Sequence, residues 1–182
     1  MDALQTLVQT FVGSARGCLP GPASMQAHPR ALLNDPEDDF QIVLSTWAPG
    51  RVSPIHAHGN NVGVVAALVG ETVETKFERR AQGHGRVELR AQDRTPIGPG
   101  SVSPLLPNDT DQVHRVANAS GQWATTVHVY MNTMLVYEVY PEPYAGSVRS
   151  ILVPLHFDAR RLWRQWARPR ELGAFAPMAM AL

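Results

Sequence analysis

The sequence predicts an all-β fold, a sandwich or barrel of short strands, preceded by a short helical segment. From Phe40 onward, short apolar or alternating runs follow one another, separated by Gly, Pro, Asn and Asp. This spacing of strands and turns is typical of sandwiches and barrels. The 182 residues suit one domain with one core. Apolar residues make up 44% of the chain, which favours a globular protein over a disordered one.

The N-terminal segment, residues 1–36, is expected to be helical. The apolar residues of the first dozen positions recur at helical spacing, and Asp2 is a suitable cap. Gly13 or Gly17 is a suitable end for this helix. A second short helix or turn is predicted around residues 25–33, before a run of Asn, Asp and Pro stops it.

The barrel is predicted to occupy residues 37–155. Its expected strands are 40–47, 62–69, 71–79, 86–91, 100–104, 112–118 and 124–132, with a hairpin tip at 81–85. The strand at 71–79 alternates through Val73 and Phe77, so Glu74 is expected on the exterior.

The tail, residues 156–182, is rich in arginine and carries two tryptophans. It is predicted to be a C-terminal arm that packs on the barrel or on a partner subunit. Residues 1–182 are therefore predicted to form a single domain, as a monomer or homodimer.

Charge and cysteine content exclude several classes of function. Lys+Arg and Asp+Glu number 16 each, so the formal net charge is zero. The net charge therefore provides no electrostatic attraction to nucleic acid or to acidic membranes. The single cysteine, Cys18, permits neither an internal disulfide nor a cysteine metal cluster. Neither a signal peptide nor a membrane-spanning run is recognisable. We therefore expect a cytoplasmic protein.

Two of the seven histidines, His56 and His58, form an H-x-H pair. On a strand both rings point to the same face, because side chains alternate with period two. Two imidazoles on the inner wall of a barrel could then bind one ion. An isolated H-x-H is more commonly a pair of surface or capping histidines, so the flanking residues decide between the two interpretations.

The flanking glycines favour the metal site. Gly50 precedes His56 by six positions, and Gly70 follows His58 by twelve. This spacing reproduces the first cupin motif, G-x5-H-x-H-x4-E-x6-G, except that Gly63 stands at the glutamate. The all-β fold is therefore predicted to be a cupin jelly-roll β-barrel.

His114 is the predicted third ligand. It begins an H-x3-N sequence, the core of the second cupin motif, and the two motif strands lie close together in a jelly roll. Three neutral imidazoles leave an Fe(II) ion its full charge, whereas two histidines and a carboxylate would remove one unit. Open positions could then take a thiolate, whose pKa the metal lowers, together with dioxygen. Zinc, nickel or copper would also suit three imidazoles.

Thr126, His128 and Tyr130 alternate onto one face of a predicted strand. A hydroxyl, an imidazole and a phenol in a row can form a hydrogen-bonded chain that ends near the metal, where Tyr130 could donate to the reacting atoms. Polar side chains on an inward face are costly unless they are paired. The row therefore favours a catalytic role over a purely structural one.

The chain resembles the cysteine dioxygenase family of thiol dioxygenases over roughly residues 25–140. The resemblance is carried by Arg30 with Phe40 and Trp47, by residues 53–58 with 70–75, and by residues 114–118 with 126–130. It implies that iron(II) is bound by the three histidines named above, and that Thr126, His128 and Tyr130 are the catalytic relay, with threonine in place of serine. It also implies that Arg30 binds the substrate carboxylate, which matches the bidentate pairing of arginine with carboxylates.

Two positions depart from the family pattern. Animal members carry a cysteine at the position of Gly63 that crosslinks to the tyrosine, so no thioether is expected in this chain. Many bacterial members have glycine there. The residue between the first two ligands is usually aspartate, whereas here it is Ala57. An aspartate there could orient a ligand histidine.

The leading hypothesis is an iron(II)-dependent enzyme that adds dioxygen to the sulfur of a small carboxylate-bearing thiol, giving a sulfinic acid. Cysteine is the first choice of substrate, and 3-mercaptopropionate or mercaptosuccinate are the alternatives. A dicarboxylate would need a second cation, for which Arg51 and Arg115 are candidates. Two other classes remain open, a non-catalytic metal- or ligand-binding cupin and a metal-dependent isomerase or non-thiol dioxygenase.

Overall fold

The structure is a computed structural model, and it describes residues 2–15, 30–59, 61–105, 113–142 and 146–160. Within these ranges, one helix precedes thirteen short or medium strands. These are α1 (Asp2–Ala15), β1 (Arg30–Leu32), β2 (Gln41–Trp47), β3 (Ile55–Ala57), β4 (Gly63–Val69), β5 (Thr72–Gly83), β6 (Arg86–Ile97), β7 (Val102–Leu105), β8 (Val113–Ala117), β9 (Ala124–Tyr130), β10 (Val136–Tyr140), β11 (Ser147–Val148), β12 (Ile151–Pro154) and β13 (Ala159–Arg160).

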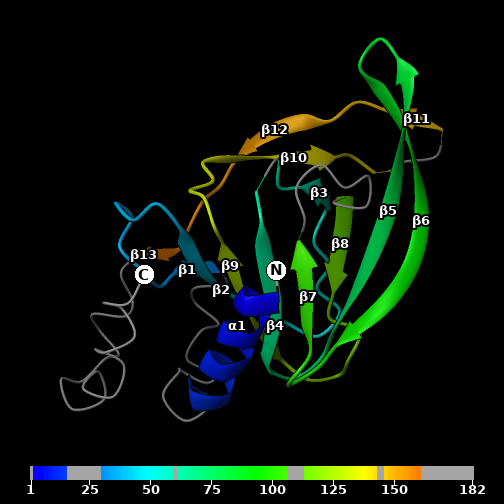
Figure 1. The fold of residues 1–182 in the computed structure, drawn as a ribbon. Helices are drawn as coiled ribbons and strands as arrows, with labels where there is room; N and C mark the ends of the chain where they lie inside the picture. Colours follow the sequence, from blue (N-terminus) through cyan, green and yellow to red (C-terminus); the bar gives the residue numbers. More distant parts are fainter. Residues whose placement is uncertain (1, 16–29, 60, 106–112, 143–145, 161–182) are drawn as a thin grey trace.

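The strands form two curled sheets (Figure 1). Sheet A has the order β13-β1-β2-β9-β4-β7, and sheet B has the order β11-β6-β5-β8-β3-β10-β12. Strands distant in sequence, such as β2 and β9, are neighbours in space, as expected for a jelly roll. The predicted all-β jelly-roll fold with a short N-terminal helix is therefore confirmed.

The centre of sheet A is built from β2, β9 and β4, which are rich in β-branched residues that suit a buried strand. The helix α1 covers the outer face of this sheet by packing Val8 and Val12 against Leu44, Val64 and Val127. Because side chains alternate along a strand, the neighbouring residues of the same strands point into the interior of the barrel.

Sheet B is also covered on its outer face. Phe77 of β5 and Val113 of β8 are paired and join Ile55 and Tyr140 in one apolar cluster. His114, the next residue after Val113, consequently points inward. The same alternation turns Glu74 inward, and its exposed fraction is only 1%. The prediction that Glu74 faces the exterior was wrong, because the apolar side of β5 packs on the outer cluster.

The N-terminal prediction needs two corrections. Gly13 lies inside α1 instead of ending it, at a cost of about 1 kcal/mol relative to alanine. Residues 30–32, expected in a helix or turn, form β1, which pairs antiparallel with β2 and parallel with β13. These two pairings bury Ala31 and Leu32 completely or nearly so, which outweighs local helical preference. Gly17 and residues 25–29 lie outside the described part of the chain.

Of the predicted C-terminal arm, only residues 156–160 are described, and β13 within them pairs with β1 at the edge of sheet A. The predicted packing of the two tryptophans of the arm falls outside the described residues. Within the described ranges, no helix is long and apolar enough to cross a membrane.

Candidate metal centre

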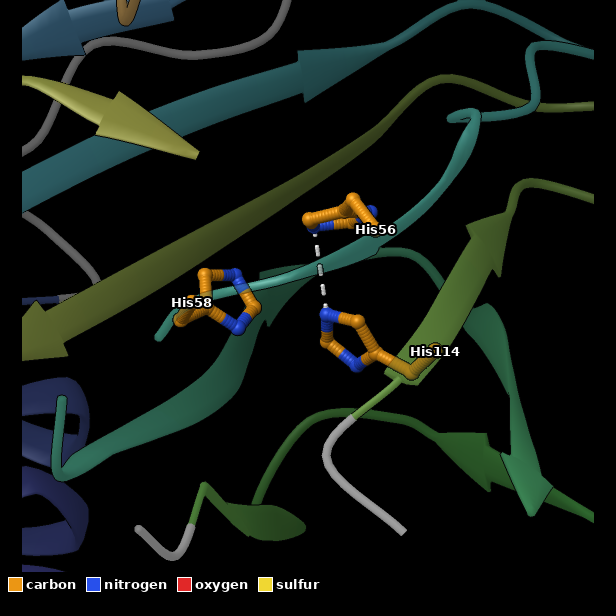
Figure 2. Close-up of side chains that lie close together, drawn as sticks. All are labelled: His56, His58 and His114. Carbon is orange, nitrogen blue, oxygen red and sulfur yellow. Dashed lines mark hydrogen bonds between the residues drawn. The ribbon is translucent and has the colours of Figure 1, made fainter. Parts of the chain in front are cut away.

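Three histidines converge in the interior of the barrel (Figure 2). His56 on β3 and His114 on β8 lie directly opposite each other in the register of sheet B. His58 follows the last residue of β3. One ligand nitrogen from each ring lies within 4.8 Å of the other two. The fold therefore brings together the three histidines that the sequence predicted as a group.

The hydrogen bonds of two rings determine which nitrogen can bind an ion. Nδ1 of His56 lies 2.9 Å from the carbonyl oxygen of Pro54, and Nδ1 of His114 lies 2.5 Å from Oε1 of Glu74. Both oxygens can only accept a hydrogen bond, so both Nδ1 atoms donate one. The Nε2 atom of each neutral ring then carries no hydrogen and has a free lone pair. These two Nε2 atoms are 3.2 Å apart, joined by the dashed line in Figure 2.

Two nitrogen lone pairs at this separation repel each other unless a cation lies between them. At this separation both nitrogens could bind one ion of the size of a first-row transition metal. The third ring is held more loosely. Nε2 of His58 lies 3.4 Å from the hydroxyl of Tyr130, and its buried Nδ1 has no partner within the described residues. The donor set therefore fits a divalent transition metal.

Burial keeps this group in the form that binds metals. It lowers the pKa of His56 and of His58 well below the usual histidine value. The proximity of the other rings and of the Arg30 guanidinium lowers both pKa values further. Neutral imidazoles at pH 7 leave their lone pairs available, so metal does not have to displace protons from these two rings.

The predicted polar row forms a continuous hydrogen-bonded chain on β9. Oγ1 of Thr126 lies 2.8 Å from Nε2 of His128, and Nδ1 of His128 lies 3.3 Å from the hydroxyl of Tyr130. A third contact sets its direction, because the indole Nε1 of Trp47 lies 2.8 Å from Oγ1 of Thr126. An indole N–H can only donate, and among the described residues Nε2 of His128 is the remaining partner for the threonine hydroxyl hydrogen, so we assign that hydrogen to Nε2 of His128.

This direction leaves Nδ1 of His128 as the protonated nitrogen, which donates to the oxygen of Tyr130. The phenol hydrogen is then available to the interior, on the side of His58. Burial lowers the pKa of His128 to about 3 and raises the pKa of Tyr130. Both groups therefore stay neutral across the physiological range. The row of hydrogen bonds thus holds the Tyr130 hydroxyl as a donor of one hydrogen bond toward the interior.

Arg30 lies on the same interior wall. It pairs with Ser45 across β1 and β2, and Ser45 pairs with Thr126 across β2 and β9, so their side chains share one face of sheet A. The guanidinium carbon lies 5.8 Å from the ring centroid of Tyr137. The Tyr137 ring in turn stands edge-on to His56 with centroids 5.7 Å apart. Tyr137 therefore contacts both the guanidinium and one ring of the three-histidine group.

The other predicted cation candidates do not join this wall. Arg115 follows the inward-facing His114, so it points to the opposite face, where its guanidinium pairs with Glu142 at 2.8 Å. Arg51 is exposed in the turn before β3. Within the described residues, Arg30 is thus the arginine whose charge acts on the histidines of the site.

Four residues near the site carried no site prediction from the sequence: Glu74, Ser103, Tyr137 and Trp47. Trp47 was noted only as part of the family resemblance. Their contacts depend on register between distant strands, which short-range patterns do not encode. For Glu74 the strand itself gave no signal of a paired, inward group, because β5 also carries Glu78, Lys76 and two arginines.

The family described as cysteine dioxygenase type I matches residues 23–141, well over half of the chain.

Three solved structures show the range of structural likeness. The chain matches a Cupin_2 domain of an XRE-family transcriptional regulator from Enterobacter cloacae with 18% identity and a TM-score of 0.43, covering 59% of this chain and 99% of that one.

A cupin-superfamily sugar phosphate isomerase from Silicibacter pomeroyi matches with 19% identity and a TM-score of 0.46, covering 75% of this chain and 83% of that one. Peruvianin-I, a cysteine peptidase from Thevetia peruviana latex, matches with 16% identity and a TM-score of 0.40; the alignment covers 52% of this chain and 51% of that one. These structural likenesses carry no argument about activity.

The match to the family model extends from β1 through β10 and includes all the residues of the metal centre, so the chain belongs to the cysteine dioxygenase type I family.

Proposed function

We propose that this protein is an iron(II)-dependent thiol dioxygenase that converts a small thiol with one carboxylate, cysteine first, into its sulfinic acid. The observation that carries the proposal is the position of the Arg30 guanidinium. It lies on the same interior wall as the Tyr130 relay, and one aromatic ring, Tyr137, contacts both the guanidinium and His56. A substrate with an anionic group at one end and sulfur at the other could bridge the two.

In this proposal His56, His58 and His114 hold the iron through one imidazole nitrogen each. When bound, iron(II) supplies open positions for a thiolate and dioxygen and the electrons that activate dioxygen toward sulfur. The overall reaction balances without another reductant: RSH + O2 gives RSO2H, with both oxygen atoms added to sulfur. Dioxygen is the oxidant, and the electrons that reduce it are those that sulfur loses.

Arg30 would bind and orient the substrate. Guanidinium and carboxylate form two parallel hydrogen bonds, which fix direction as well as distance. Tyr137 contacts the guanidinium through a cation–π interaction. The absence of a second arginine on this wall, within the described residues, favours a monocarboxylate over mercaptosuccinate.

Tyr130 would donate one hydrogen bond to the reacting oxygen or sulfur. Its hydrogen is available because His128 donates to the phenol oxygen from the other side. The burial that raises the pKa of Tyr130 keeps the phenol protonated, so it remains a donor throughout turnover. The chain from Trp47 through Thr126 holds this arrangement in one direction.

Oxygen uptake by iron(II)-loaded protein tests the proposal, with cysteine, 3-mercaptopropionate, mercaptosuccinate and cysteamine compared at equal concentration. We expect uptake coupled to sulfinic acid for cysteine or 3-mercaptopropionate, and weaker uptake for cysteamine, which lacks a carboxylate. Bound iron with no uptake for any thiol would contradict the proposal and favour a non-catalytic metal-binding cupin. Preferential turnover of mercaptosuccinate would contradict the assignment of a single carboxylate.

A further inference from the structure

The interior of the barrel holds a carboxylate that the proposed reaction does not use. Glu74 lies on β5 with an exposed fraction of 1%. It is paired with Val116 of β8, two residues after His114, so the two side chains share the inner face of sheet B. An ionised carboxylate in such a position is costly unless its oxygens are paired.

Both oxygens of Glu74 have short, directed partners. Oε1 accepts from Nδ1 of His114 at 2.5 Å, and Oε2 accepts from the hydroxyl of Ser103 at 2.5 Å. Ser103 belongs to β7 in sheet A, so the carboxylate also joins the two sheets. Among the described residues, His114 is the one basic group within ion-pair distance of Glu74. The carboxylate is therefore paired with the imidazole of His114, while the Lys76 ammonium acts on it from a greater distance.

Gly63, which stands on the inner face of β4, has no side chain to offer as a ligand. The three histidine rings offer neutral nitrogen donors. Any metal they bind would keep its whole positive charge unless an anion lies behind the rings.

We propose that Glu74 supplies this anion, acting through His114 as the negative group of the metal centre. The proposal rests on the metal-binding part of the proposed function and does not depend on the identity of the substrate. A carboxylate that accepts from Nδ1 orients the ring and makes Nε2 a stronger electron donor. A buried negative charge near the ion also favours the higher oxidation state, because its attraction to the metal is weakly screened.

Two effects should follow for the metal itself. The affinity for a divalent ion should depend on Glu74, although Glu74 is not a ligand. The Fe(III)/Fe(II) midpoint potential should be lower with the carboxylate present than without it. Ser103 should act in the opposite direction, because its hydroxyl donates to the same carboxylate and withdraws electron density from the bond to His114.

The experiment compares Glu74→Gln with Glu71→Gln by anaerobic titration of the apoproteins with iron(II) and, separately, with zinc. Gln keeps the shape of the side chain and can still accept from His114, but it removes the charge. Glu71 lies just before the same strand and is exposed, so it is the matched control. We expect ~10- to 100-fold weaker binding of both metals by Glu74→Gln and no change for Glu71→Gln. We also expect a more positive iron midpoint potential for Glu74→Gln in spectroelectrochemical titration.

Ser103→Ala provides a second test that keeps the carboxylate in place, and it decides the matter if Glu74→Gln does not fold. We expect its iron midpoint potential to fall below that of the wild type. Zinc affinity of Glu74→Gln within twofold of wild type with an unchanged iron potential would overturn the proposal, as would an unchanged or higher potential for Ser103→Ala. Because zinc binding and potential need no thiol, failure of the proposed dioxygenase activity would not be mistaken for failure here.

Discussion

Gly63 and Tyr130 lie directly opposite each other on β4 and β9, and a Cβ atom at position 63 would stand 3.2 Å from Cδ1 of the Tyr130 ring. It would also lie 2.6 Å from the carbonyl oxygen of Val129, closer than such contacts allow. The backbone of β4 therefore touches the residue that would donate to the substrate. A side chain at position 63 would therefore require the backbone of β9 to shift.

Gly63→Ala tests this contact. The methyl group should force the two strands apart and move the Tyr130 ring, with a loss of about 1–3 kcal/mol in the free energy of unfolding and a fall in kcat. Urea unfolding followed by circular dichroism measures the first effect, and oxygen uptake measures the second. Gly121→Ala is the matched control, because a Cβ at Gly121 meets nothing within 4 Å. Equal stabilities of the two variants would contradict the close approach.

Arg30→Ala should weaken carboxylate substrates without loss of iron. Losing a charged pair of hydrogen bonds costs about 1.5–3 kcal/mol, or roughly 10- to 150-fold in kcat/KM. The rate with cysteamine should change little, because that thiol has no carboxylate. Arg115→Ala is the control, since Arg115 pairs with Glu142 on the opposite face. Unchanged kcat/KM for the best carboxylate thiol in Arg30→Ala would remove Arg30 from the substrate site.

Thr126→Val should interrupt the relay that starts at Trp47. The variant keeps the volume of the side chain but removes the hydroxyl that contacts both Trp47 and His128. We expect kcat to fall on the order of 10-fold while KM stays near the wild-type value, as for a positioning residue. Thr126→Ser keeps the hydroxyl and should behave as wild type. A rise in KM with unchanged kcat would instead indicate a role in substrate binding.

Acid should destabilise the apoprotein through its buried histidines. The pKa of His128 falls from its usual value to about 3 on folding, so below about pH 6.5 the unfolded chain binds a proton that the folded chain does not. The free energy of unfolding should then fall by up to ~1.4 kcal/mol per pH unit for this histidine between pH 6.5 and about 3.

His56 and His58, whose pKa values are also lowered, act in the same direction. Urea unfolding midpoints of metal-free protein between pH 5 and 8 measure the slope. His128→Gln should reduce it. A stability that is flat or rises toward pH 5 would contradict neutral buried histidines.

The strands of the barrel could be predicted where a short segment has the length, composition and alternation of a strand. The apolar run of β4 and the alternating polar row of β9 have lengths and compositions typical of buried strands. The two-residue spacing of His56 and His58, with its flanking glycines, likewise predicted a shared site. Each of these signals lies within one stretch of at most 21 residues, so a single segment carries it.

The remaining features depend on contacts between distant segments. β1 has three residues and exists because β2 and β13 pair with it, the latter about 130 positions away. Glu74 was placed on the wrong face because alternation gives two faces but does not say which is inside when both are covered. The bond from Trp47 to Thr126 likewise requires the register of β2 against β9.

The central claim is that this chain adds both atoms of dioxygen to the sulfur of a carboxylate thiol at a three-histidine iron centre. Turnover of cysteine under 18O2, with mass spectrometry of the product, tests it most directly, with His114→Ala as the inactive control. The account predicts a sulfinic acid carrying label in both oxygen positions, formed in equal amount to the dioxygen consumed. Disulfide or unlabelled product in place of doubly labelled sulfinic acid, with cysteine and with 3-mercaptopropionate, would contradict it.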